Sequence, residues 1–148
     1  MGEDPVIEGF RSQAAAVSVG TRASMDRAIS ENASMVLDGV SLVPGLLDLE
    51  SYAELADVIF LVVATLDEEA FVGRFEAREV GARRRATHRY LENLDAILKI
   101  QEHLLTMAER EDVPIVDNES FDRSVLLIIR HVVEALRKRG GFSTEELL

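Results

Sequence analysis

Apolar residues recur at helical spacing in three stretches of the chain. A repeat at positions i, i+3, i+4 and i+7 places one stripe of apolar side chains along one face of a helix. We therefore expect one or two helices between Gln13 and Ile29, despite Gly20. Three further helices are predicted: Glu69 to Arg78, where Thr65 and Glu68 resemble a capping box, then Tyr90 to Glu111, and about Asp122 to Arg139, the last one ended by Gly140 and Gly141.

Three shorter apolar runs have the character of β-strands. The run from Val58 to Val63 is continuously apolar, which is typical of a strand covered on both faces. A second run, Ser34 to Asp38, ends in a carboxylate and is followed by Gly39. The third is Val113 to Asp117, whose Pro114 suits the first residues of an edge strand. The sequence therefore predicts three strands.

These strands alternate with long helices, and that order predicts an α/β domain built on a parallel sheet. In such a domain the ligand-binding groups gather at the carboxyl ends of the strands. The length of 148 residues and the hydrophobic content of 47% fit a single domain over residues 1–148. The tail 142–148 is expected either to fray or to form a short docking helix.

The charge balance narrows the possible functions. With 16 basic and 27 acidic residues the net charge is −11, which disfavours binding to nucleic acid or to an anionic membrane surface. The absence of cysteine rules out disulfides, thiolate metal sites and cysteine nucleophiles. The apolar runs are shorter than the roughly 20 residues of a membrane span, and the first residues lack the pattern of a signal peptide. We expect a soluble, cytoplasmic protein.

Asp38 is the most informative acidic residue in this pattern. It ends a predicted strand and precedes Gly39, which lets a ligand approach the backbone closely. A carboxylate there suits a hydrated Mg²⁺ ion, which takes only one or two protein carboxylates. The alternative is that Asp38 caps the following turn with its side chain. Position alone does not separate the two interpretations.

The arginines are distributed unevenly. Six guanidinium groups in one segment make a positive patch suited to bidentate phosphate binding, and Gly81 favours a mobile lid there. The alternative is a solvated helix end whose arginines pair with Glu76 and Glu79. His88 adjoins this cluster and is a candidate substrate contact, whereas the three histidines are too far apart to form a metal site by spacing. The six arginines are Arg74, Arg78, Arg83, Arg84, Arg85 and Arg89.

Several blocks of the sequence resemble a known family. Their order and spacing, from about Pro5 to Arg137, are similar to those of the 2-phosphoglycerate kinases, a branch of the P-loop kinases. No single block is decisive on its own. The resembling blocks are Met35 to Gly45, Phe71 to Arg78, His88 to Asn93 and Val113 to Asn118, with Ile7 to Phe10, Gln13 and Arg27 to Ile29 upstream.

The resemblance implies a three-layer parallel sheet of the P-loop kinase type, and transfer of a phosphoryl group from ATP to a small phosphorylated acid with Mg²⁺. Such chemistry consists mainly of positioning the reactants and neutralising charge. The resemblance implies that Asp38 is the acidic residue at a strand end that contacts the metal ion, and that Arg74 and Arg78 are lid arginines. It further implies that the substrate contacts are Arg22, Arg27, His88 and Arg89, and that the adenine-binding loop is Asn118 to Ser120.

One departure from the family pattern is large. The phosphate-binding motif Gly-x-x-x-x-Gly-Lys-Ser/Thr occurs nowhere in the sequence. The resemblance therefore implies the C-terminal portion of such a kinase, incomplete at its N-terminal strand and not active alone. In the family that strand lies between those of Asp38 and Val58, and its loss would expose unpaired backbone groups. We expect the two strands to re-pair directly, or the gap to be filled by another chain or a second copy.

Two other interpretations of the sequence stay open. One is a non-catalytic interaction module that keeps the kinase-like scaffold and uses the exposed edge or the arginine patch to bind a partner. The other is a truncated product with no independent role. The leading hypothesis remains a kinase-like domain whose partners are a small phosphorylated metabolite and either a second copy or a chain that supplies the missing strand.

Overall fold

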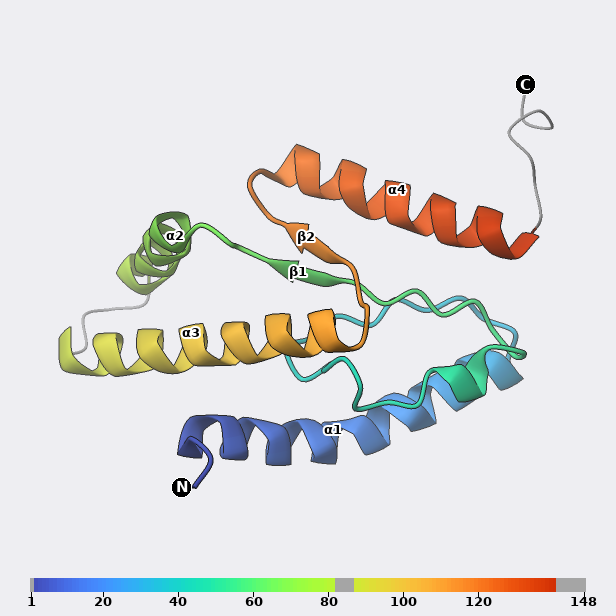
Figure 1. The fold of residues 1–148 in the computed structure, drawn as a ribbon, viewed down its shortest axis with the longest axis horizontal. Coiled ribbons are helices and arrows are strands. Elements are labelled where there is room, and N and C mark those ends of the chain that lie inside the picture. The colour runs from blue at the N-terminus through green and yellow to red at the C-terminus, as the bar shows by residue number, and fades with distance from the viewer. Residues whose placement is uncertain (1, 82–86, 141–148) are drawn as a thin grey trace.

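The computed structural model describes residues 2–81 and 87–140, and of residues 78–81 and 87–91 only the helical backbone. Helix α4 lies on one side of two short strands, and α3, with α1 beyond it, lies on the other side (Figure 1). In chain order the elements are α1 (Pro5–Ser30), a short 3-10 helix η1 (Glu50–Tyr52), β1 (Val62–Ala64), α2 (Glu68–Gly81), α3 (Thr87–Arg110), β2 (Ile115–Asp117) and α4 (Phe121–Gly140).

The four predicted helical stretches are confirmed. The first is a single helix of 26 residues, and it begins earlier than predicted because Asp4 caps it. The Asp4 Oδ1 atom accepts a hydrogen bond from the Val6 N–H at 2.9 Å, and Pro5 occupies the first turn, where no backbone donor is needed. The predicted tail 142–148 and the arginines 83–85 lie outside the described residues.

Helix α1 packs on α3 and forms the main hydrophobic cluster with it. Phe10 and Ala14 are buried, and Val43 from the loop after α1 joins them. The ring of His103 on α3 meets Phe10 edge-on, with 6.1 Å between the ring centroids. The partly buried side chains that complete the cluster from α3 are Ile100, Leu104 and Met107.

The segment from Val40 to Gly45 is a loop, and it turns sharply at its end. Val43 and Pro44 are buried, and Gly45 has φ +82°, a conformation that other residues rarely adopt. A Cβ atom on Gly45 would also lie 2.8 Å from the side chain of Glu111. Glycine is therefore favoured there for its backbone freedom, and a larger residue would also require the Glu111 side chain to move.

The two strands pair in parallel, with Val62 opposite Ile115, Val63 opposite Val116 and Ala64 opposite Asp117. The Val62 N–H donates to the Pro114 carbonyl at 3.0 Å, and the Asn118 N–H donates to the Ala64 carbonyl at 2.7 Å. The strands predicted over Val58 to Val63 and Val113 to Asp117 are thus confirmed in part, with shorter extents. The α/β class and the parallel pairing are confirmed with them.

The strand predicted over Ser34 to Asp38 is wrong. These residues form irregular, exposed backbone, and the Val36 side chain is 93% exposed. A strand is stabilised by hydrogen bonds to a neighbour, and no described strand pairs with this segment. In the described part of the chain the sheet therefore has two strands where three were expected.

Tyr52 in η1 ties this helix to α1. It is only 8% exposed, and its hydroxyl donates to the Asp26 carboxylate at 3.0 Å. Desolvation, and then the hydrogen bond to Asp26, raise the pKa of Tyr52 above its usual 10.0. The folded state thus favours the protonated phenol.

This shift predicts a loss of stability in alkali. The stabilisation from the raised pKa is complete below pH 10, the ordinary value for tyrosine, and is lost as the pH rises through the folded-state pKa. We expect the free energy of unfolding, measured by urea titration, to decline above pH 10 in the native chain and to decline less steeply in Tyr52→Phe. Equal slopes in the two proteins would contradict this role.

Candidate functional site at the strand ends

The carboxyl ends of β1 and β2 lie side by side because the strands are parallel and in register. Polar residues follow both strands directly: Thr65 after β1, and Asp117, Asn118 and Glu119 at the end of β2. The Leu66 N–H donates to Asp117 Oδ1 at 3.2 Å, and the Gln101 side-chain amide on α3 donates to the Thr65 carbonyl at 3.1 Å. The segment after β1 is therefore fixed to both β2 and α3.

Arg74 projects from α2 onto these strand ends. Its Nη1 donates to Thr65 Oγ1 at 3.0 Å, and its Nη2 donates to the Glu119 carbonyl at 2.9 Å. A guanidinium group has five N–H donors, so further donors remain for an anion. The residue is exposed, and anions in solution can reach it. Arg74 thus has a fixed position and still has N–H donors with which to bind an anion.

Helix α2 sets the position of Arg74. Asp67 precedes the helix, and its Oδ1 accepts a hydrogen bond from the Ala70 N–H at 2.9 Å. Thr65, which together with Glu68 resembled a capping pair in the sequence, instead accepts from Arg74. The start of α2 is thus fixed by Asp67, about two turns before Arg74.

Asn118 and Ser120 hold the start of α4. The Ser124 hydroxyl lies 2.8 Å from Asn118 Oδ1 and 2.8 Å from the Ser120 carbonyl, and the Arg123 N–H donates to Ser120 Oγ at 3.4 Å. Both predicted nucleotide contacts lie in the loop that follows β2, next to the Arg74 contact at Glu119. Their side chains are engaged within this loop.

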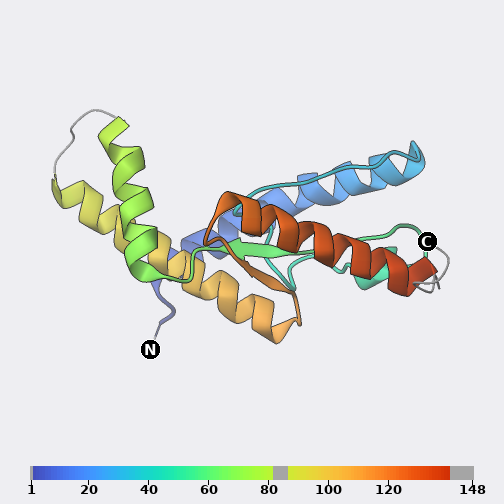
Figure 2. The ribbon, with the colours of Figure 1, turned by 90° about the horizontal axis from the view of Figure 1, so that it is seen from above.

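The other predicted site residues on α1 and in the coil lie elsewhere. The C-terminal end of α1 and helix α2 are at opposite ends of the molecule in both ribbon views (Figures 1 and 2). Arg27 is paired with Glu31 at 2.8 Å, and Arg22 acts electrostatically on Tyr52. Asp38 is exposed and makes no hydrogen bond or ion pair with another described residue. The structure does not bring these three residues to Arg74.

Three predicted residues cannot be placed in the site at side-chain level. Arg78 lies in α2, and His88 and Arg89 lie at the start of α3, but their side chains are outside the described part of the structure. Their roles stay predictions.

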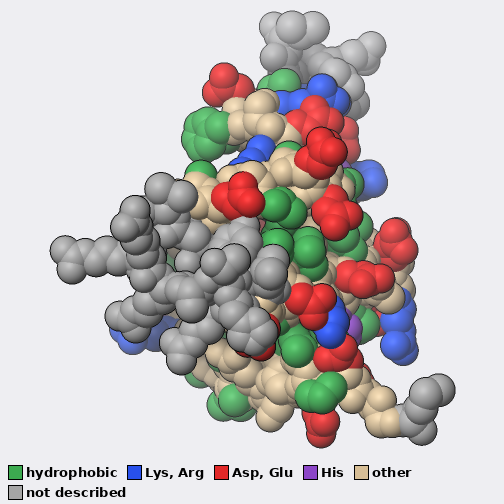
Figure 3. Space-filling view, turned by 90° about the vertical axis from the view of Figure 1, so that its left-hand side faces the viewer, with side chains coloured by type: hydrophobic (Ala, Val, Ile, Leu, Met, Phe, Trp, Pro, Cys, Tyr) green, Lys and Arg blue, Asp and Glu red, His purple; other side chains and the backbone are tan. Residues whose placement is uncertain are grey.

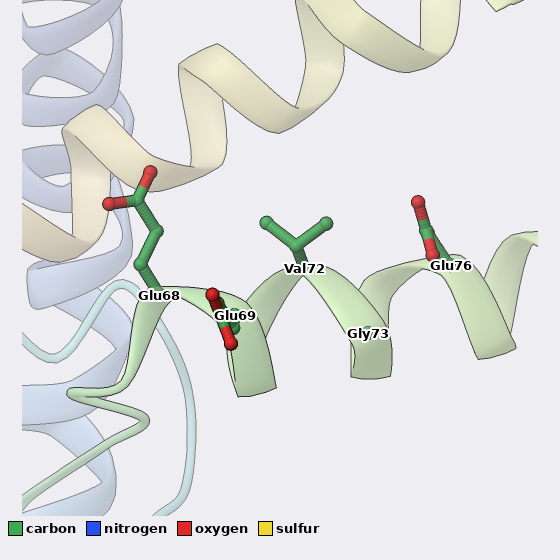
Figure 4. A pocket seen from close by; sticks show the side chains of 5 residues that line it. All are labelled: Glu68, Glu69, Val72, Gly73 and Glu76. Carbon is green, nitrogen blue, oxygen red and sulfur yellow. The ribbon is translucent and has the colours of Figure 1, made fainter.

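A shallow hollow of about 370 Å³ lies along α2, lined by Glu68, Glu69, Val72, Gly73 and Glu76. Glu68, Val72 and Glu76 point from one side of α2 toward α3 (Figure 4). At this end of the molecule acidic side chains are scattered among hydrophobic ones (Figure 3). Its carboxylates repel phosphate groups, so this hollow is not an anion site.

The described residues contain no group of three or more His, Asp or Glu placed to hold a metal ion. Within the same residues, no helix is both long and apolar enough to cross a bilayer. The sequence analysis named Arg74 as a candidate but did not name its contacts with Thr65 and the Glu119 carbonyl, nor the contact of Gln101 with Thr65. The available signal was the presence of polar residues directly after two strands expected to be parallel neighbours.

Comparisons with known proteins give sequence relatives. No protein-family model and no solved structure matches the chain. It is 35% identical over 146 residues to the 2-phosphoglycerate kinase of Pyrococcus furiosus, an alignment that covers 96% of this chain and 47% of that protein. The 2-phosphoglycerate kinase of Methanopyrus kandleri is 34% identical, with 92% of this chain and 42% of the relative covered. The chain spans about half the length of the curated relatives it matches.

Proposed function

The chain belongs to the 2-phosphoglycerate kinase family, and from this premise we propose that it contributes one half of a small-molecule kinase. In this proposal phosphoryl transfer to a small phosphorylated acid requires both this chain and a polypeptide that carries the phosphate-binding loop. The observation that carries the proposal is the position of Arg74. Its guanidinium group is fixed over the ends of two parallel strands and has further N–H donors with which to bind an anion.

Arginine suits the chemistry proposed for this site. Negative charge spreads over the transferred group during phosphoryl transfer, and fixed donors stabilise that charge without having to reorganise. Arg74 is held by Thr65 and by the Glu119 carbonyl before any ligand arrives. Arg78 stands four residues further along α2, a spacing that places two side chains on the same helix face. We assign both residues to charge neutralisation, with His88 and Arg89 as substrate contacts.

The described residues do not fit a nucleotide triphosphate by themselves. A triphosphate needs a glycine-rich turn of backbone N–H groups and a lysine that reaches the phosphates. Lys99 lies within α3 and is engaged by Asp4 and Asp95, at 3.0 and 3.1 Å. Lys138 lies in the last turn of α4. Neither lysine follows such a turn, so in this proposal the ATP cradle comes from the complementary polypeptide.

This reasoning predicts that the isolated chain does not bind MgATP. Isothermal titration calorimetry should give no measurable heat of binding at protein concentrations of about 100 μM. An affinity in the micromolar range would contradict the inference from the missing phosphate loop. A parallel titration into a full-length relative of the family serves as the positive control.

The open edge of β1 supports a role for a complementary chain. Val62 and Ala64 direct their hydrogen-bonding groups to β2, so the groups of Val63 between them face the other edge. The segment from Met35 to Leu37 is exposed and apolar, with side chains 42%, 93% and 41% exposed. A parallel sheet is normally buried on both faces and has more than two strands. A further strand beside β1 would pair with Val63.

Arg22, Arg27 and Asp38 are assigned on the family resemblance alone. Asp38 is exposed, and a single carboxylate suffices as a Mg²⁺ contact because this ion keeps most of its waters. Bound Mg²⁺ would supply charge neutralisation at the phosphates. Asn118 and Ser120 are assigned to the adenine-binding loop on the same resemblance.

A chimera tests the proposal directly. The matching segment of the Pyrococcus furiosus relative is replaced by this chain, and ATP-dependent phosphorylation of 2-phosphoglycerate is measured. We expect activity from the chimera and none from the chain alone. A folded but inactive chimera would contradict the proposal.

The exposed edge also favours a second candidate function, a non-catalytic interaction module. This alternative predicts that the chain binds the complementary half of the relative but that the complex does not phosphorylate 2-phosphoglycerate. The activity of the chimera therefore separates the two functions.

A further inference from the structure

Helix α4 is apolar on two opposite faces. One face packs toward β2 and is buried or half-buried, through Ser124, Leu127, Ile128 and Val132. The other face, which we call the outer stripe, consists of Leu126, Ile129, Val133 and Leu136, with 59%, 54%, 39% and 45% of each residue exposed. A helix with apolar residues on opposite faces is normally buried between two partners.

Nothing in the described part of the chain covers the outer side of α4. Figure 1 shows β2 below the helix and no described element above it, and in Figure 2 the helix lies uncovered in front of the others. The spacing of the outer stripe is three, four and three residues, the pattern of a seam that meets a second helix by knobs-into-holes packing. The geometry of the stripe therefore indicates a helix as its partner.

A row of arginines borders the outer stripe. The row consists of Arg123, Arg130 and Arg137, which are seven residues apart. Arg130 and Arg137 directly follow the stripe residues Ile129 and Leu136. Arg123 follows Asp122, which lies one turn before the first stripe residue, Leu126. All three are exposed. Arg123 lies 3.5 Å from Glu119, whereas Arg130 and Arg137 make no ion pair with any other described residue. Glu134 stands between Arg130 and Arg137 on this face, so the row carries a net charge of +2 on a protein whose net charge is −11.

The arginine border argues against a second copy as the partner. In an antiparallel pair of α4 helices the residues that follow the seam face one another, so Arg130 would oppose Arg130, and Arg123 would oppose Arg137. In a parallel pair Arg130 and Arg137 would face the positions of Val125 and Val132. Neither arrangement places a carboxylate at the positions that face the arginines, and the antiparallel one places like charges together.

We propose that the outer stripe of α4 is a docking site for an amphipathic helix of another protein, whose apolar seam is bordered by Asp or Glu residues. The apolar residues of that helix cover Leu126, Ile129, Val133 and Leu136. Its carboxylates pair with Arg130 and Arg137, which have no partner among the described residues. This inference is independent of the proposed kinase function, because none of these residues belongs to the strand-end site.

Two designed peptides test the docking site. Each is a helical peptide of about 21 residues with Leu at the seam positions, and the bordering positions are Glu in one peptide and Lys in the other. Repulsion between the bordering charges keeps each peptide monomeric. We expect the Glu peptide to bind the full chain at least tenfold more tightly than the Lys peptide, by fluorescence anisotropy, and its affinity to fall with added salt.

Variants of the chain separate docking from folding. Ile129→Asp should weaken binding of the Glu peptide at least tenfold, whereas Val19→Asp, at a 63% exposed apolar position on α1, should leave it unchanged. The double variant Arg130→Glu with Arg137→Glu should reverse the preference toward the Lys peptide. Circular dichroism checks that each variant keeps its helices.

Three results would overturn the proposal. The first is absence of binding by the Glu peptide, and the second is equal binding of both peptides by the native chain. The third is a dimer of the chain in sedimentation that Ile129→Asp dissociates, because a second copy would then cover the stripe. Since the charge-reversal variant changes only exposed residues, its preference remains measurable even if Ile129→Asp fails to fold.

Discussion

Replacing Arg74 by alanine in the chimera with the Pyrococcus furiosus relative is expected to lower the rate of 2-phosphoglycerate phosphorylation about 100- to 1,000-fold. Arg74 is fixed by Thr65 and the Glu119 carbonyl, so its remaining donors are already in place when charge develops on the transferred group. Removing it eliminates that stabilisation in the transition state. The loss should therefore appear mainly in kcat, measured by a coupled assay of ADP release.

Two further substitutions define what Arg74 does. Arg74→Lys keeps the charge but loses the planar fork, so it should restore only part of the rate. Arg11→Ala is the matched control, because Arg11 is an exposed arginine paired with Glu3 at 2.7 Å on α1. It should leave the rate unchanged. If Arg74→Ala retains full activity, or if Arg11→Ala loses as much, the assignment of Arg74 is wrong.

Replacing Phe10 by alanine is expected to have the largest effect on stability, about 3 kcal/mol of unfolding free energy. Phe10 is 6% exposed and packs with Ala14 and Val43 against α3. Its truncation leaves a cavity where α1 and α3 meet. Because small domains are stable by only about 5–15 kcal/mol, much of the variant should unfold at modest urea concentrations, as followed by circular dichroism.

A matched control on the same helix checks that the effect comes from packing. Val19 is 63% exposed on α1, and Val19→Ala should change the unfolding free energy by no more than about 0.5 kcal/mol. A similar loss in both variants would show that the α1–α3 contact does not dominate the stability of the chain.

The helices could be predicted because their signal is local. The apolar spacing predicted that α1 is a helix, but not which face of it is buried: the polar Ser18 and Thr21 are buried, whereas Val19 is 63% exposed. The helix ends follow local rules as well. Asn32 and Asp112 take positive φ after α1 and α3, at 50° and 54°, where Asn and Asp are tolerated better than most residues.

The strands could be predicted only in part because pairing is not local. Ser34 to Asp38 and Val113 to Asp117 are both short apolar runs that end in aspartate, and only the second forms a strand. The difference is the neighbour: Ile115 to Asp117 lies beside β1, whereas the earlier run has no described strand beside it. An apolar run indicates the capacity to form a strand, and a partner's hydrogen bonds decide whether one forms.

For this protein the sequence alone determined the helices, the α/β order, the acidic charge and the family resemblance, because each is recorded in the order and kind of neighbouring residues. Only the tertiary structure decided which polar groups meet. Arg74 reaches Thr65 nine residues away and Glu119 across 45 residues, through the parallel register of β1 and β2. The tertiary structure likewise decided that Asp38 lies away from Arg74 and that one apolar face of α4 is uncovered. Burial depends on contacts between distant segments of the chain.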